Sequence, residues 1–197
     1  MKIESGETYE EQIFSAVEMV AARISATEFY DCQFVDCHFS ETEFLNCQFH
    51  DCHFKDSDLS LLKLTGSVFH SSSFHNCKLI GVDWTLLTYR KFIKGAPMQF
   101  KECDLTYGTF ISLTLQKLQA TNCKLHEVDF SEADLTEANL SHAQLEGAQF
   151  RHTNLTQANL RKATGYDIDI THNTVTQAKF SLPEALSLLH RLNIEVD

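Results

Sequence analysis

A large apolar residue recurs at every fifth position along most of this 197-residue chain. One run of these centre positions extends from Ile24 to Trp84, and a second extends from Phe100 to Leu160. A period of five fits neither the 3.6 residues of an α-helical turn nor the two residues of a β-strand. The period therefore predicts a repeat architecture, in which each short unit buries its apolar side only by stacking on its neighbours.

A second column, of small side chains, lies two residues before each centre, and we call these the small positions. They hold mainly Cys, Ser and Thr early in the chain and mainly Ala later. All seven cysteines of the chain occupy them: Cys32, Cys37, Cys47, Cys52, Cys77, Cys103 and Cys123. Because Cys alternates there with Ser, Thr and Ala, we interpret the thiols as small buried side chains, neither disulfide-bonded nor metal-binding. An odd number of thiols and the lack of an N-terminal signal pattern favour a cytoplasmic protein.

Two inward residues in every five predict a coil with flat sides. If each pentad forms one side of a square, four pentads close a turn of about 20 residues. Successive turns would then pair like neighbouring strands, about 4.8 Å apart. The large centre residues would fill the middle of the coil, and the small residues would fit the crowded wall beside them.

Three stretches match the motif A(D/N)LXX of the pentapeptide-repeat family letter for letter. They are Ala133–Leu135, Ala138–Leu140 and Ala158–Leu160. The chain resembles that family over about residues 14 to 180, and the resemblance implies a right-handed quadrilateral β-helix. We therefore expect an all-β solenoid at 14–180, preceded by a lead-in at 1–13 and followed by a C-terminal element at 181–197.

The pentads end at Phe180, and a helical pattern follows. Ser181 and Glu184 have the spacing of a capping box, and Pro183 suits the first turn of an α-helix. The helix could only cap the solenoid, or its wide apolar face could form an interface between two copies. The candidate interface residues are Leu182, Leu186, Leu188, Leu189 and Leu192.

The pentad register slips by one residue in the interruption at about 85–99, which predicts an insertion of one net residue. This stretch holds the only basic cluster of the chain, with Arg90, Lys91 and Lys94. It could be a bulge tolerated on the outside of the coil or a protruding contact element, because regular coils offer only flat walls.

Acidic side chains recur two residues after the centre, at what we call the turn positions. The candidate partner-binding carboxylates are Asp31, Asp36, Glu41, Asp51, Asp56, Glu127, Glu132 and Glu137. Two pairs among them, 20 residues apart, should stack as short ladders in adjacent coils. The formal net charge is −11, which disfavours direct binding to nucleic acid but suits competition with DNA for a basic channel. These acids could also be ordinary solvated turn residues.

Signatures of enzymes and cofactor sites are missing from the sequence. It lacks G-x-G-x-x-G, G-x-x-x-x-G-K-[ST], H-E-x-x-H and G-x-S-x-G. His50 and His70 are 20 residues apart, as are His152 and His172, but two stacked imidazoles do not make a metal site without further ligands. We therefore expect no catalysis, no cofactor, no metal and no membrane segment.

The size, the central interruption and the C-terminal sequence resemble those of small bacterial Qnr-type and albicidin-resistance proteins. That resemblance implies a homodimer joined through the C-terminal helix. It also implies binding to DNA gyrase or topoisomerase IV and protection of the enzyme from quinolones or peptide toxins. The competing hypothesis is a structural or adaptor scaffold for protein–protein interaction, which needs neither the acidic excess nor a dimer.

Overall fold

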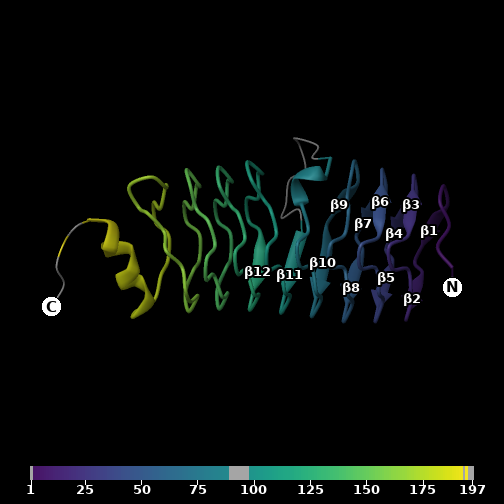
Figure 1. Ribbon diagram of the computed structural model, residues 1–197, viewed down its shortest axis with the longest axis horizontal. Helices are drawn as coiled ribbons and strands as arrows, with labels where there is room; N and C mark the ends of the chain where they lie inside the picture. The colour runs from purple at the N-terminus through teal and green to yellow at the C-terminus, as the bar shows by residue number, and fades with distance from the viewer. Residues whose placement is uncertain (1, 89–97, 193, 195–197) are drawn as a thin grey trace.

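The computed structural model describes residues 2–88, 98–192 and 194, with the side chains of residues 190 and 191 left out. The chain winds into a straight rod of stacked coils, with the N-terminus at one end and a short helix at the other (Figure 1). Its strands are β1 (Thr8–Glu10), β2 (Ile13–Ser15), β3 (Arg23–Ser25), β4 (Glu28–Tyr30), β5 (Gln33–Val35), β6 (Glu43–Leu45), β7 (Gln48–His50), β8 (His53–Lys55), β9 (Val68–His70), β10 (Ser72–His75), β11 (Met98–Lys101) and β12 (Gln119–Thr121). Two 3-10 helices complete it, η1 (Trp84–Leu86) and η2 (Glu184–Leu192).

All strand pairs are parallel and form three sheets along the walls of the rod. The orders are β1-β4-β7-β9, β3-β6 and β12-β11-β10-β8-β5-β2, and we call the last the long sheet. Centre positions stand opposite each other in these pairs, as in Phe29↔Phe49 and Phe49↔Phe69. Beyond β12 single parallel bridges continue the ladders, for example Thr114↔Asp134. The expected pentapeptide β-solenoid is therefore confirmed.

The centre residues form one continuous core. Phe rings of successive coils stack face to face, with centroids 4.8 Å apart for Phe29 and Phe49 and 4.5 Å apart for Phe49 and Phe69. Rings on adjacent sides of a coil meet edge to face, as Phe44 and Phe49 do at 5.3 Å. Offset stacks and edge-to-face contacts are the favoured arrangements of aromatic rings, so this geometry adds to the stabilisation from burial.

Nearly all described turn positions have left-handed backbone geometry, and Leu86, which lies in η1, is an exception. At the non-glycine turn residues with this geometry φ lies between 50° and 64°. Asn and Asp tolerate this conformation better than most residues because their short side chains bond to the local backbone. The conformation therefore gives Asp31, Asp36, Asp51 and Asp56 a structural reason to be aspartate, but it gives none for glutamates such as Glu41.

The small positions meet their backbone neighbours in two different ways. Early in the rod, a side chain bonds to the preceding coil: Ser67 Oγ donates to Phe44 O at 2.8 Å and accepts from Cys47 N at 2.9 Å. Later in the rod, a backbone N–H of the same turn bonds to the carbonyl of the centre residue, as Ala133 N donates to Phe130 O at 3.1 Å. A methyl group is then sufficient, which explains the change from Cys, Ser and Thr to Ala.

The prediction of a one-residue insertion was wrong. Ladder partners are 20 residues apart on both sides of the interruption. Across it, however, Cys77 N donates a hydrogen bond to Cys103 Sγ, 26 residues on, and Ser72 pairs with Met98. This turn therefore holds six extra residues. Because the repeat has five, a shift of six and a shift of one look the same in the sequence. Thr88 N still bonds to Ser67 O in the regular register, so the extra residues fall between Thr88 and Met98.

The C-terminal helix lies where the sequence predicts it, but η2 is a 3-10 helix and not an α-helix. The capping box is also not formed by the expected hydroxyl. Ser181 Oγ accepts from Lys162 N at 3.2 Å, and Ser181 O accepts from Ala185 N at 3.0 Å. The hydroxyl thus ties the start of η2 to the last regular coil.

Candidate partner-binding surfaces

The two aspartate ladders flank the long sheet at its N-terminal end. Asp31 and Asp36 lie at either end of β5, and Asp51 and Asp56 lie at either end of β8. Asp31 N donates to His50 O at 3.0 Å and Asp36 N donates to Lys55 O at 3.0 Å, which places each aspartate beside its partner in the next coil. Both ladders stop there, because the following turn residues are Ser71 and Asn76.

One of these carboxylates is held ionised by a neighbour. Asn76 Nδ2 donates to Asp56 Oδ1 at 2.7 Å, and this hydrogen bond lowers the pKa of Asp56. Lys55 Nζ lies 3.7 Å from Asp56 Oδ2 and lowers the pKa further. Asp56 thus keeps a negative charge beside β8 at neutral pH.

The other acidic candidates do not join these ladders. Glu41 lies at a different corner of the rod, and Glu127, Glu132 and Glu137 occupy three successive corners of one later coil. These later acids have local partners: Glu137 Oε2 is 3.7 Å from Lys117 Nζ, and Glu132 Oε2 accepts from Ser112 Oγ at 2.7 Å. The structure therefore separates the eight candidates into one cluster of four aspartates and four scattered glutamates.

The acidic charge is concentrated at the N-terminal end of the rod. The first 60 residues hold 13 acidic and 3 basic residues, a net charge of −10, whereas the remainder holds 14 acidic and 13 basic residues, a net charge of −1. The acidic excess is therefore a property of the N-terminal end and not of the whole chain. A running sum of charge along the sequence would have located it.

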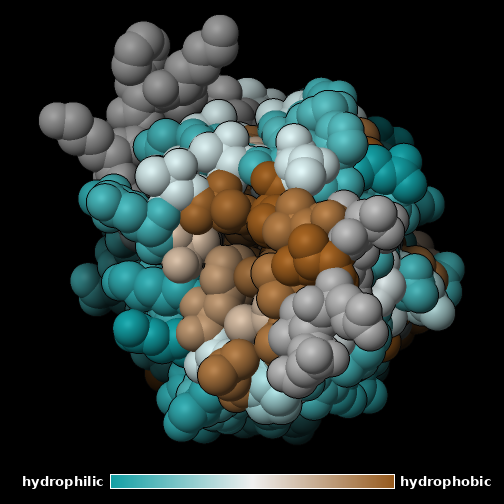
Figure 2. Space-filling model, turned by 90° about the vertical axis from the view of Figure 1, so that its left-hand side faces the viewer, coloured by the Kyte–Doolittle hydropathy of each residue, from teal (hydrophilic) through white to brown (hydrophobic). Residues whose placement is uncertain are grey.

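The C-terminal end of the rod is apolar. Figure 2 looks onto this end and shows a hollowed hydrophobic surface surrounded by polar residues. Leu182 is 76% exposed, Leu186 46% and Leu192 38%, whereas Leu188 packs against the core and Leu189 is half-buried. The helix η2 therefore covers the last coil with Leu188 while it leaves Leu182, Leu186 and Leu192 facing outward.

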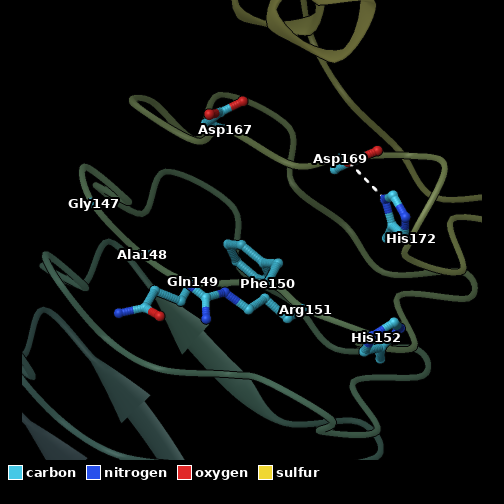
Figure 3. Close-up of a pocket in the computed structure, with 9 residues that line it drawn as sticks. All are labelled: Gly147, Ala148, Gln149, Phe150, Arg151, His152, Asp167, Asp169 and His172. Atoms are coloured by element: carbon cyan, nitrogen blue, oxygen red, sulfur yellow. Dashed lines mark hydrogen bonds and ion pairs between the residues drawn. The ribbon is translucent and has the colours of Figure 1, made fainter. Parts of the chain in front are cut away.

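A groove with a volume of about 490 Å³ lies beside the last coil (Figure 3). It opens where one ladder ends: Asp129 pairs with Gln149, but no described residue continues this bridge, although Gln144↔Thr164 and Asn154↔Thr174 are intact. Gly165 stands where a centre residue is expected, and Tyr166 and Ile168 are the buried residues that follow it. The chain from Gly165 to Asn173 consequently arches away from Gln149–Arg151.

The polar groups in this groove mainly hold the arch together. Asp169 Oδ1 accepts from both the backbone N and the hydroxyl of Thr171, at 2.9 and 2.6 Å, and Asp169 Oδ2 lies 2.9 Å from His172 Nδ1. These bonds hold the pKa of Asp169 well below its usual range. His152 and His172 do lie one coil apart, with ring centroids 6.3 Å apart, but no cluster among the described residues could hold a metal ion.

The basic candidates Arg90, Lys91 and Lys94 lie outside the described residues. In the sequence they stand between Thr88 and Met98, the stretch that contains the six extra residues. In the part of the chain that is described, no helix combines the length and the apolar character needed to cross a membrane.

Two family models match the chain. The pentapeptide repeat region model matches residues 27–110, and the model of eight pentapeptide repeats matches residues 115–151 and 143–181. Because these matches cover well over half of the sequence, the chain belongs to the pentapeptide-repeat family. A search of the curated protein sequences found no match.

Solved structures of QnrB1, described as a plasmid-mediated fluoroquinolone resistance protein, share the fold along nearly the whole chain. A trypsin-treated variant is 20% identical, with a TM-score of 0.68, covering 93% of this chain and 99% of that one. A second trypsin-treated variant is 18% identical, with a TM-score of 0.67 and 97% coverage of both chains. The full-length form is 22% identical, with a TM-score of 0.59, covering 92% of this chain and all of that one. At these identities the likeness concerns the fold.

Proposed function

We propose that this protein is a non-catalytic DNA mimic that binds DNA gyrase, topoisomerase IV or both. In this proposal it protects the enzyme from a quinolone or a peptide toxin. The observation that carries the proposal is the pair of aspartate ladders at the acidic end of a stiff rod. Regularly spaced carboxylates match DNA phosphates in sign, so they suit a basic channel that normally holds DNA.

The likeness to QnrB1 supports the same function, because that protein confers fluoroquinolone resistance and its fold coincides with this one over nearly its whole length. The six-residue insertion provides a second candidate contact. We include Arg90, Lys91 and Lys94 in the proposed partner-binding residues, since they form the basic cluster of the sequence between Thr88 and Met98.

We further propose a homodimer joined at the apolar C-terminal ends. The exposed Leu182, Leu186 and Leu192 would pack against the same residues of a second copy, as an isologous interface requires. Joining the rods there brings together their nearly neutral parts and keeps the acidic ends far apart, which limits charge repulsion. In such a dimer the two aspartate clusters lie at the outer tips.

Light scattering tests the dimer. The double variant Leu182→Glu/Leu186→Glu should be monomeric, because four charges would be buried at the interface. The matched control is Leu61→Glu, which places a charge on an exposed leucine of the side wall and should leave the dimer intact. A double variant that keeps the mass of a dimer would mean that η2 is only a cap.

The main test is a gyrase supercoiling assay with ciprofloxacin or albicidin present and increasing amounts of the protein. Wild type should restore supercoiling. The variant Asp31→Asn/Asp36→Asn/Asp51→Asn/Asp56→Asn should lose the effect, and the matched variant Glu127→Gln/Glu132→Gln/Glu137→Gln should retain it. Asn keeps the preference for the left-handed turn, so the first variant removes charge without disturbing the fold.

Each outcome of this assay is decisive. Equal loss in both variants would contradict the assignment of the contact to the aspartate cluster. A wild-type protein without effect on either gyrase or topoisomerase IV would favour the adaptor scaffold, in which the same walls bind another protein.

A further inference from the structure

The N-terminal end of the long sheet is an unpaired strand edge. β2 is the last strand of the sheet and pairs with β5 on one side only. Gln33 N donates to Gln12 O at 2.9 Å and Ala16 N donates to Val35 O at 3.0 Å, so the groups on either side of Ile13 and Ser15 bond inward. In a parallel ladder the bonding direction alternates along the strand. The N–H and C=O groups of Ile13 and Ser15 therefore point out of the end of the rod.

Two neighbouring strands at this end, β1 and β3, have local contacts on their outer edges. On β1, Glu10 O accepts from Gln12 Nε2 at 2.8 Å. On β3, Ser25 N donates to Ser5 Oγ at 3.0 Å and Ser25 O accepts from Gly6 N at 2.9 Å. Among the described residues, none pairs with the outer side of β2, whereas η2 lies across the opposite end of the rod (Figure 1).

Apolar surface and a hollow accompany the open edge. The Ile13 side chain on β2 is 61% exposed, and Val20 on the next wall is 56% exposed. A hollow of about 410 Å³ adjoins Ser15 and is lined by Lys2 and residues 15–19. An added strand would thus find backbone partners, an apolar contact and room for a side chain.

The negative charge around the outer edge of β2 favours a basic partner segment. Glu11 precedes β2, and the two aspartate ladders begin one coil below it, at Asp31 and Asp36. Two copies meeting at this end would each bring the net charge of −10 of the first 60 residues, so they would repel. A basic segment would be attracted by the same charges.

We propose that the outer edge of β2 binds an extended, basic segment of a partner protein by strand addition. The segment pairs with Ile13 and Ser15 through its backbone, and its Lys or Arg side chains reach the carboxylates of Glu11, Asp31 and Asp36. Strand addition is a general mode of peptide recognition, and natural proteins protect an edge that has no such use. The site does not depend on the partner being a topoisomerase.

Fluorescence anisotropy with labelled peptides tests the proposal on the wild-type protein. A short peptide that alternates Lys and Val should bind, and one that alternates Glu and Val should not. The Lys–Val peptide N-methylated at every residue keeps its charge but has no backbone N–H left, and its methyl groups block both of its edges. It should bind about tenfold more weakly or worse, since two backbone hydrogen bonds are lost.

Two further measurements locate the site. In NMR spectra of the isotopically labelled protein, the Lys–Val peptide should shift the amide signals of Ile13 and Ser15 and leave those of the C-terminal half unchanged. Ile13→Pro removes one edge donor that bonds to no described residue, and it should weaken binding more than the matched control Ile13→Ala.

The proposal fails if the N-methylated peptide binds as tightly as its parent, because binding would then be charge adhesion alone. It also fails if neither Lys–Val peptide binds or if the amide shifts lie away from β2. Should Ile13→Pro not fold, the comparison of the two peptides on wild type still decides.

Discussion

The early and late coils of this rod build the same cross-section with different chemistry. Before the insertion, the centres are mainly Phe and the small positions are mainly Cys, Ser and Thr, which bond from coil to coil. After it, the centres are mainly Leu, and Ala is the commonest residue at the small positions, as at Ala133, where the turn satisfies its own carbonyl. The difference between the halves follows the turn backbone: where the turn does not close its own hydrogen bond, as at Phe44, a hydroxyl or thiol from the next coil bonds to the carbonyl instead.

Truncating a core ring should have the largest effect, and a larger effect in the early coils. Phe49 stacks on Phe29 and Phe69, whereas Phe130 stacks on Phe110 and Phe150 at 5.2 and 5.5 Å among aliphatic neighbours. Phe49→Ala and Phe130→Ala should each lower the free energy of unfolding by about 3–5 kcal/mol, with Phe49→Ala at the upper end. Urea unfolding measures both. A loss near zero for either would refute the close packing of that coil.

Removing a hydroxyl should distinguish the two halves directly. Ser67→Ala leaves Phe44 O and Cys47 N without the hydroxyl that bonds to both, and it should cost about 1–3 kcal/mol. Thr153→Ala is the matched change in the late coils. Thr153 Oγ1 donates to Phe130 O at 2.8 Å, but Ala133 N donates to the same oxygen, so the loss should be smaller. Equal losses in urea unfolding would contradict the proposed difference between the halves.

The thiols should make the protein less stable in alkaline solution. Burial raises the pKa of Cys52 from 9.0 to about 12. Below pH 9 this thiol is neutral in both states, so its stabilisation is complete there. Between pH 9 and 12 it ionises only in the unfolded chain, so stability falls as the pH rises. The urea midpoint should therefore decrease above pH 9.

The variant Cys52→Ala should reduce that pH dependence. Tyr166 in the last coil is the matched late group, because burial raises its pKa from 10.0 to about 12. Tyr166→Phe should remove only the part of the loss that begins near pH 10. A midpoint independent of pH in wild type would show that the thiols are accessible to water.

The smallest predicted change in stability should have opposite signs in the early and the late coils. Asp51→Asn keeps the left-handed turn and removes repulsion from Asp31, so stability should rise by a few tenths of a kcal/mol. Glu137→Gln removes an exposed ion pair with Lys117 at 3.7 Å and should lower stability by about 0.2–1 kcal/mol. Thermal unfolding at low and high salt should show both differences shrink as salt rises. The same sign for both would argue against a repulsive ladder.

The sequence predicted the solenoid well because its period of five has no competing interpretation. The same periodicity concealed the insertion, since a whole extra pentad leaves the register unchanged. The effect of Gly165 on the last coil could not be predicted from the sequence. It depends on whether Ile168 or Ile170 turns inward, and hydrophobicity does not decide between them because both are apolar. The acidic candidates could be named from their position, but only the pairing of coils separates Asp31, Asp36, Asp51 and Asp56 from Glu127, Glu132 and Glu137.

The insertion between Thr88 and Met98 has a consequence for how such a rod can change. Because the 26-residue turn still delivers β11 onto β10 in register, the walls before and after it stay in phase. The length of the rod can therefore change only by whole turns. Deleting one 20-residue turn should shorten the rod by about 4.8 Å without rotating any wall, and a dimer joined at its apolar ends would shorten by about 10 Å. The distance between the two acidic tips of such a dimer can thus be altered only in steps of whole turns.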